Sequence, residues 1–225
     1  RDKEDILAPL SSGIGSIWAE EHFKRLYWSE TVADTRWELA HRSIIRYYDI
    51  TRKKVRDLTH EGRLYDPTSS PDGQYLCCLE YPWEGGNNLV FLSATDGKIL
   101  QRIRVPDGIQ ATEIAWWKDN TFYVAGISKK GAGLYHVSAE GKWDTVLEPC
   151  IQILVNLAAA DGVLEWISDR DGSNELYRYY PEEGKLLQYT SARYGLTDAA
   201  EEDGFLYYVA QTLEGTMLFR TPMIS

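Results

Sequence analysis

The chain has 225 residues, of which 44% are hydrophobic and 12% aromatic, so it can bury a core and does not have the composition of a disordered protein. It contains no run of about 18 apolar residues, which excludes a transmembrane helix. The formal net charge of −10 opposes binding to nucleic-acid phosphates and to anionic membrane surfaces.

The N-terminal quarter contains the least regular copy of a repeated unit. Residues 5–12 are predicted to form a strand, and the polar residues 20–23 a turn. Strands are predicted at 25–28 and 44–48, with residues 31–42 inserted between them. An insertion of this length in a compact domain is often functional, so we expect a short helix or a cap over one face.

The clearest copy of the unit runs from Tyr65 to Val105. Ser70-Pro71-Asp72-Gly73 separates its first two strands, and Thr95-Asp96-Gly97 precedes its last strand. These are turn sequences, because Pro presets φ, Asp bonds to its own backbone and Gly accepts a positive φ. The β-branched and aromatic residues between the turns suit half-buried strands.

Similar turns follow at 118–120, 161–162 and 203–204, each before a Tyr-, Phe- or Trp-containing strand. Successive turns are 42 to 50 residues apart, which is the period of a propeller blade. The sequence therefore predicts an all-β fold, a single β-propeller domain of about five four-stranded antiparallel blades. The predicted blades are 14–60, 64–107, 110–150, 152–192 and 194–225, with residues 5–12 as the outer strand of the last blade.

Two segments resemble a known family. Residues 168–177, Ser-Asp-Arg-Asp-Gly-Ser-Asn-Glu-Leu-Tyr, look like the S-D-R-D-G-x-x-x-[IL]-Y segment of the TolB-like (WD40-like, PD40) propellers of bacteria. Residues 67–73 look like the P-x-W-S-P-D-G segment of that family, with Ser69 in place of the usual Trp. The resemblance implies a β-propeller and an extracytoplasmic, periplasmic location, and it says little about function.

Two arrangements of the blades remain open. The chain begins with a predicted outer strand, residues 5–12, and ends after a third strand, residues 216–221. The first strand can complete the last blade and close a five-bladed ring, which would protect strand edges. Alternatively the chain is part of a six- to eight-bladed propeller, which the missing initiator Met favours. The charged start, Arg1 to Asp5, has no signal-peptide core.

Four polar residues are expected around one mouth of the central channel. Counting back from each turn to the start of the innermost strand gives Asp66, Glu113, Asn156 and Asp198. This ring can bind a cation, a sugar or a peptide amine, and a pair of its carboxylates can act as in a glycosidase. The alternative interpretation is that these side chains cap strand ends and bond loop amides.

Two tryptophans are candidates for contact with a partner. Trp37 lies in the 31–42 insertion, and Trp83 lies in a polar loop before Glu84-Gly85-Gly86-Asn87. Exposed aromatic residues on loops are enriched at interfaces.

Two pairs of adjacent residues are expected to point to opposite faces of their strands. Cys77 and Cys78 lie in an apolar run, so we expect both thiols to be buried and to diverge. A disulfide between one of them and Cys150 is not indicated. Trp116 and Trp117 are expected to place one ring in the core and the other toward a neighbouring blade, or to serve as a platform for a sugar.

The sequence contains no motif that assigns catalysis. It has four histidines, none in a pair with metal-ligand spacing, and it has neither a Gly-x-Ser-x-Gly elbow nor a Cys-x-x-Cys pair. No catalytic residue, metal or cofactor is predicted. The sequence favours a non-catalytic binding or scaffold propeller that contacts a protein or peptide in the bacterial cell envelope. The alternatives are a carbohydrate-binding or glycoside-processing propeller and the gating domain of a larger protease.

Overall fold

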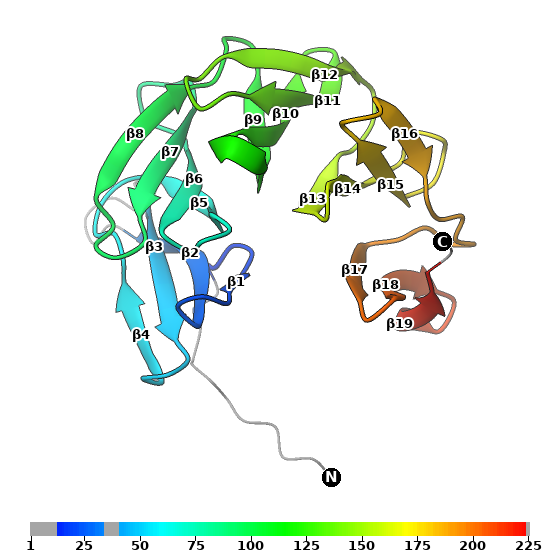
Figure 1. Cartoon of the computed structure of the whole chain (residues 1–225), viewed down its shortest axis with the longest axis horizontal. Coiled ribbons are helices and arrows are strands. Elements are labelled where there is room, and N and C mark those ends of the chain that lie inside the picture. The colour runs from blue at the N-terminus through cyan, green and yellow to red at the C-terminus, as the bar shows by residue number, and fades with distance from the viewer. Residues whose placement is uncertain (1–12, 34–40, 224–225) are drawn as a thin grey trace.

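The computed structural model describes residues 13–33 and 41–223. In these residues the chain forms strands and one short 3-10 turn, η1 (Lys118–Asn120). The strands make five antiparallel sheets in which each strand pairs with its neighbour in sequence. This arrangement confirms the predicted all-β propeller with five blades (Figure 1).

The blades follow the chain in order. Blade 1 contains β1 (Trp18–Glu20), β2 (Arg25–Ala33), β3 (His41–Asp49) and β4 (Lys54–Asp57). Blade 2 contains β5 (Leu64–Ser69), β6 (Tyr75–Glu80), β7 (Asn88–Ser93) and β8 (Ile99–Arg104). Blade 3 contains β9 (Gln110–Trp116), β10 (Phe122–Ser128), β11 (Gly131–Val137) and β12 (Trp143–Cys150). Blade 4 contains β13 (Val155–Ala160), β14 (Val163–Ser168), β15 (Glu175–Tyr180) and β16 (Lys185–Gln188). Blade 5 contains β17 (Asp198–Glu202), β18 (Phe205–Thr212) and β19 (Gly215–Pro222).

The innermost strands, β1, β5, β9, β13 and β17, surround a common axis, and Figure 1 shows an arc that is open between blade 1 and blade 5. Blade 5 has three described strands, whereas the other blades have four. The predicted outer strand of blade 5, residues 5–12, lies outside the described residues. Its pairing with β19 therefore stays a prediction.

The core consists of apolar layers between neighbouring blades. Cys78 packs between blades 1 and 2, and Cys77 packs between blades 2 and 3. Both thiols are fully buried, and burial raises the pKa of each. The divergence of the two side chains confirms the prediction from strand alternation. Cys150 is also a free thiol.

The two adjacent tryptophans diverge in the same way. Trp116 belongs to the layer between blades 2 and 3, where its Nε1 donates to the Thr68 carbonyl at 3.1 Å. Trp117 packs against the layer between blades 3 and 4 and meets the Tyr123 ring edge-on at 5.3 Å. Each ring thus joins its blade to a different neighbour.

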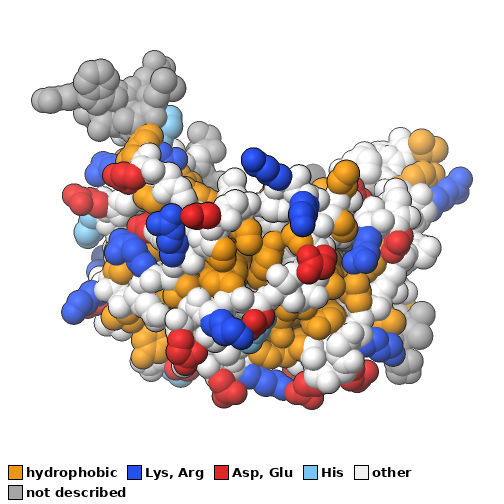
Figure 2. Space-filling view, turned by 90° about the horizontal axis from the view of Figure 1, so that it is seen from above, with side chains coloured by type: hydrophobic (Ala, Val, Ile, Leu, Met, Phe, Trp, Pro, Cys, Tyr) orange, Lys and Arg blue, Asp and Glu red, His pale blue; other side chains and the backbone are white. Residues whose placement is uncertain are grey.

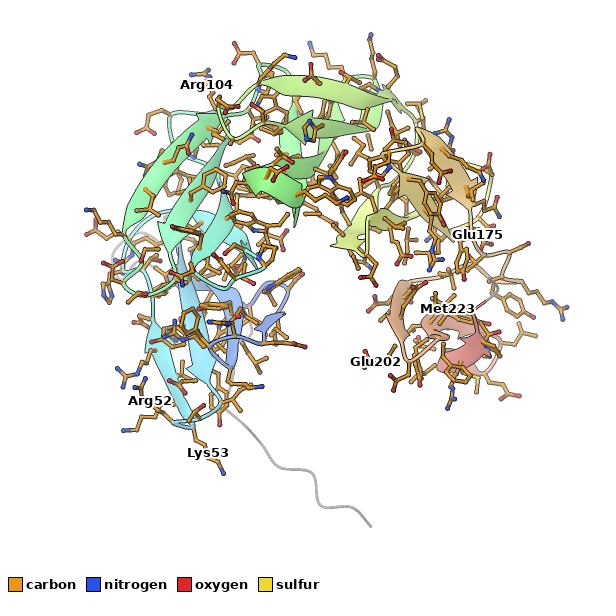
Figure 3. All side chains as sticks on the ribbon, in the orientation of Figure 1. Arg52, Lys53, Arg104, Glu175, Glu202 and Met223 are labelled. Atoms are coloured by element: carbon orange, nitrogen blue, oxygen red, sulfur yellow. The ribbon has the colours of Figure 1, made fainter. Side chains whose placement is uncertain are left out.

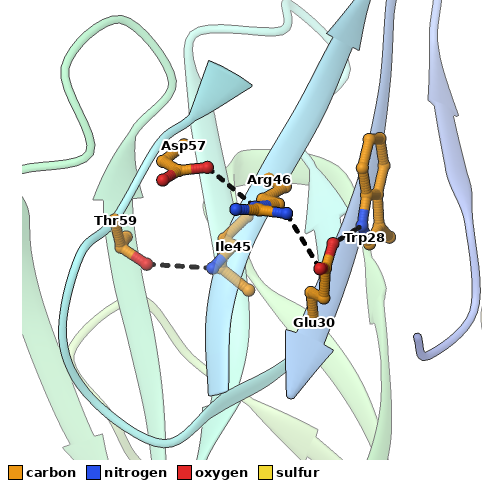
Figure 4. Close-up of polar contacts among 6 residues, drawn as sticks. All are labelled: Trp28, Glu30, Ile45, Arg46, Asp57 and Thr59. Carbon is orange, nitrogen blue, oxygen red and sulfur yellow. Dashed lines mark hydrogen bonds and ion pairs between the residues drawn. The ribbon is translucent and has the colours of Figure 1, made fainter. Parts of the chain in front are cut away.

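Side-chain hydroxyls fix the outer strands to the third strands. In blade 1, Thr59 Oγ1 accepts from the Ile45 amide at 2.9 Å (Figure 4). In blade 4, Thr190 Oγ1 accepts from the Leu176 amide, also at 2.9 Å. The same hydrogen bond to the third strand therefore follows the outer strand in two of the blades.

Blade 1 also contains a network of polar contacts across β2, β3 and β4 (Figure 4). Glu30 accepts from Trp28 Nε1 at 3.1 Å and from Arg46 at 2.8 Å, and Arg46 also contacts Asp57 at 2.7 Å. Because Glu30 is buried, these donors compensate for the loss of water around its carboxylate.

The strand order defines two faces of the propeller. Each innermost strand starts at the face that we call the mouth face, and the loops between second and third strands lie at that face too. The loops between first and second strands, and those between third and fourth strands, lie at the opposite face, which we call the turn face. Figure 3 shows Arg52 and Lys53 on the turn between β3 and β4, and Glu202 at the end of β17.

Candidate functional site: the channel mouth

The innermost strands of three consecutive blades have bulges near the mouth face. The pairing register shifts between Tyr65 and Thr68 in β5, and between Val155 and Ala158 in β13. In β9 the shift lies opposite the Ala125–Gly126 step. Asp66 and Asn156 occupy two of these bulges with φ of 50° and 59°. Bulges redirect side chains and are frequent beside functional sites.

Glu113 of β9 connects blade 3 to blade 4. One carboxylate oxygen accepts a hydrogen bond from the backbone N–H of Asn156 at 3.0 Å, and the other accepts one from the backbone N–H of Leu157 at 2.6 Å. Burial raises the pKa of Glu113, and these two hydrogen bonds act against the rise. Both oxygens therefore hold the bulge of β13 in place.

Asn156 continues the contact from blade 4 to blade 5. Its Nδ2 donates to Asp198 Oδ1 at 3.3 Å and to the Thr197 carbonyl at 3.4 Å. Asp198 Oδ1 also accepts from the amide of Ala199 at 2.9 Å. Three of the four predicted mouth residues are thus joined directly across three blades.

Asp66 differs from the other three residues. Within the described part of the chain its carboxyl makes no hydrogen bond, and burial together with the nearby charge of Glu113 raises its pKa to about 6. Two carboxyls that influence each other in this way cannot both ionise without cost. Asp66 is therefore the mouth carboxyl that makes no hydrogen bond to a described residue and whose protonation burial favours.

Two of the four predicted mouth residues have a structural role. Glu113 and Asn156 bond loop amides and neighbouring blades, as expected if these side chains cap strands. A general acid with a second free carboxylate beside it is disfavoured, because both Glu113 oxygens already accept hydrogen bonds. Among the residues that the structure describes, no group of three or more His, Cys, Asp or Glu side chains is placed to hold a metal ion.

A cavity that the sequence did not predict lies in the channel wall. It has a volume of about 320 Å³ and is bounded by the inner strands of blades 1 to 4, with Trp18, Ser69, Trp116 and Leu157 among its lining residues. Trp18 Nε1 donates to Ser69 Oγ at 2.9 Å. In the segment that resembles the TolB-like family, Ser69 replaces the usual Trp. This replacement of a large side chain by a small one was the signal in the sequence that could have indicated the cavity.

Of the two predicted surface tryptophans, Trp37 lies outside the described residues. The side chain of Trp83 is 62% exposed, and the Arg63 guanidinium lies 4.0 Å from the centre of its ring. Trp83 is on the mouth face, because it follows β6 and precedes β7.

The mouth face concentrates exposed apolar side chains. Among the described large apolar residues, five have more than half of their surface exposed. One of them, Leu218, is on β19. The other four lie in mouth-face loops or at hairpin ends of that face: Trp83 (62%), Ile127 (51%), Ile151 (98%) and Leu213 (92%). The surface shown in Figure 2 carries apolar side chains between charged ones. The apolar residues of the outer strand β8, Ile99 and Leu100, are at most half exposed.

Solved structures resemble the whole described fold. A puromycin-hydrolysing peptidase of Mycobacterium tuberculosis matches with a TM-score of 0.70 and 16% identity, over 96% of this chain and 38% of the peptidase chain. A putative TolB of Agrobacterium tumefaciens matches with a TM-score of 0.69 and 13% identity, over 88% of this chain and 73% of that chain. TolB of Acinetobacter baumannii matches with a TM-score of 0.67 and 11% identity, over 91% of this chain and 52% of the TolB chain.

The chain has the fold of the TolB-like β-propellers. No protein-family model matches the sequence, and no curated protein does either. The chain spans less than two-fifths of the peptidase and about half of the Acinetobacter TolB. None of the described helices is long and apolar enough to cross a membrane.

Proposed function

We propose that this TolB-like propeller is a non-catalytic binding domain that holds a protein or peptide partner on its mouth face. The observation that carries the proposal is the exposure of Trp83, Ile127, Ile151 and Leu213 on that face. Apolar side chains gathered on one face of a protein mark interaction sites more often than singly scattered ones do. The TolB-like fold supports a place in the bacterial cell envelope, outside the cytoplasm.

The mouth residues supply a second reason to prefer binding. Glu113, Asn156 and Asp198 link blades 3, 4 and 5 at the same face that carries the apolar loops. A rigid scaffold beneath exposed loops suits recognition, because a preorganised surface loses less entropy on binding.

The proposal is tested by selecting binders from a random-peptide display library on the immobilised protein. Selected peptides are then compared for affinity to the wild type and to two variants of the mouth face, Ile151→Asp and Leu213→Asp. We expect at least about tenfold weaker binding by each variant, because a charge replaces a buried apolar contact. The matched control is Ile50→Asp on the turn face, where Ile50 is 43% exposed.

Unchanged affinity in both mouth-face variants, or a loss of affinity only in Ile50→Asp, would contradict the proposal. Failure to select any peptide would contradict it as well. Thermal unfolding of each variant establishes that lost binding does not come from lost structure.

A second candidate function is a gating domain of a larger peptidase. The match to the mycobacterial peptidase over 96% of this chain but only 38% of the peptidase favours it. The test is the translated gene around this segment. An adjoining hydrolase domain, whose cleavage of large substrates changes when Asp66 or Trp18 in the channel is replaced, would support gating.

A further inference from the structure

Arg63 lies in the connection from blade 1 to blade 2, and its backbone is held from two sides. Its carbonyl accepts from the Tyr81 amide at 3.2 Å, and it forms a parallel bridge with Ser43 of β3. The side chain therefore starts from a fixed position on the mouth face.

The guanidinium of Arg63 differs from those of the arginines that form ion pairs. Arg46, Arg102 and Arg178 each contact a carboxylate of their own blade. Arg63 makes no hydrogen bond or ion pair through its side chain with any described residue, and its Nε is buried without an acceptor. Leaving a buried donor unpaired is unfavourable, so a ligand that accepts a hydrogen bond from this guanidinium would stabilise the site.

The partner of Arg63 is an aromatic ring. Its guanidinium lies 4.0 Å from the centre of the Trp83 ring, and Trp83 is 62% exposed. Stacking on a ring uses the flat face of a guanidinium and leaves its edge, which carries the N–H donors, free to bind. Arg and Trp are also the residues most enriched at the centres of protein interfaces.

A cavity of about 350 Å³ lies at this pair. Its lining includes Arg42, Arg63, Pro82 and three acidic residues, Glu61, Glu80 and Glu84, of which Glu80 is paired with Arg102. The charges around the cavity are thus mixed, so a ligand would be selected by the planar donors of Arg63 and not by a net positive field.

We propose that Arg63 and Trp83 form a recognition site for an acidic side chain, Asp or Glu, within an extended segment of the partner. The carboxylate accepts two hydrogen bonds from the edge of the Arg63 guanidinium, and an adjacent apolar residue of the segment packs on the exposed ring of Trp83. This inference rests on the proposed binding function of the mouth face and specifies the chemistry of the partner.

The experiment uses the same peptide display library on three immobilised proteins: the wild type, Arg63→Gln and Arg104→Gln. Arg104 is the matched control, because it lies at the end of β8 at the same face and is already paired with Asp107 at 3.0 Å. We expect Asp and Glu to be enriched among peptides selected by the wild type and by Arg104→Gln, and not by Arg63→Gln. A selected acidic peptide should bind Arg63→Gln about ten- to a hundredfold more weakly.

Two further measurements distinguish binding at Arg63 and Trp83 from binding elsewhere on the mouth face. Arg63→Lys keeps the charge but not the planar pair of donors, so affinity should still fall at least about tenfold. Binding of the acidic peptide should change the fluorescence of the wild type, and this change should shrink in Trp83→Leu. Peptides selected without an acidic preference, but weakened by Leu213→Asp, would overturn this site and leave the binding function standing. Selection of no peptide at all would overturn both.

Discussion

The two faces of the propeller differ in what their loops contact. Turn-face loops are short. Arg25 of blade 1 donates to the Ala94 carbonyl in a turn-face loop of blade 2 at 2.7 Å, and Ser70 Oγ donates to Asp72 within one such loop at 2.6 Å. Mouth-face loops leave Ile151 and Leu213 almost fully exposed. Side chains join blades at both faces, as Arg25 does at the turn face and Glu113 at the mouth face, but the mouth face also has exposed apolar side chains that are free to contact a partner.

The largest expected effect concerns glycines. At Gly97 on the turn face (φ 71°), an added Cβ would collide with the Leu58 carbonyl of blade 1, whereas at Gly85 on the mouth face (φ 93°) nothing lies within 4 Å. Gly97→Ala should therefore lower the free energy of unfolding by about 3 kcal/mol, and Gly85→Ala by about 1 kcal/mol, the latter through backbone strain alone. Urea unfolding of both variants measures the difference. Equal losses would show that the Leu58 carbonyl does not restrict the residue at position 97.

Glu113 is one of the mouth-face side chains that join blades, as Asn87 does between blades 2 and 3. Glu113→Ala removes the acceptor of the Asn156 and Leu157 amides and should destabilise the protein by about 2–3 kcal/mol. Glu113→Gln keeps one acceptor oxygen and should lose less. A Glu113→Ala variant as stable as the wild type would show that this carboxylate is not structural.

Asp66 should behave in the opposite way. Its folded-state pKa of about 6 lies above the ordinary value, so the folded protein binds more protons than the unfolded one between these values. Stability therefore falls as pH rises through this window, and Asp66→Asn should raise the free energy of unfolding near pH 7 by about 1–3 kcal/mol. Asn also tolerates the positive φ of this position.

The control for Asp66→Asn is the same comparison of unfolding free energies at low pH. At about pH 3 the wild-type carboxyl is protonated in both states, so the gain should vanish there. A gain that does not depend on pH would contradict the raised pKa.

The smallest expected effect on stability concerns the exposed apolar loops. Ile151→Asp and Leu213→Asp should change the free energy of unfolding by no more than about 0.5 kcal/mol, since both side chains are more than nine-tenths exposed. Thermal unfolding beside the wild type measures this. Losses as large as that of Gly97→Ala would mean that the mouth-face loops also carry the fold.

Much of the candidate site follows from counting along the sequence. The count from each turn to the start of the innermost strand selects Asp66, Glu113, Asn156 and Asp198, and the structure joins the last three by hydrogen bonds. The count can be made because turn sequences such as Ser70-Pro71-Asp72-Gly73 fix where each strand begins. That these residues form a functional site stays a prediction. The count did not reveal the bulges of β5 and β13, because a bulge depends on how two strands pair and not on either strand alone.

The sequence by itself determined the propeller, the five blades and the divergence of Cys77 and Cys78, because turn chemistry and strand alternation act between near neighbours in the chain. Only the tertiary structure decided which oxygens of Glu113 accept hydrogen bonds, that Trp18 bonds to Ser69, and that Arg63 lies on the ring of Trp83. These contacts join different blades or loops, so they depend on blade packing and strand register, which no local pattern of residues specifies.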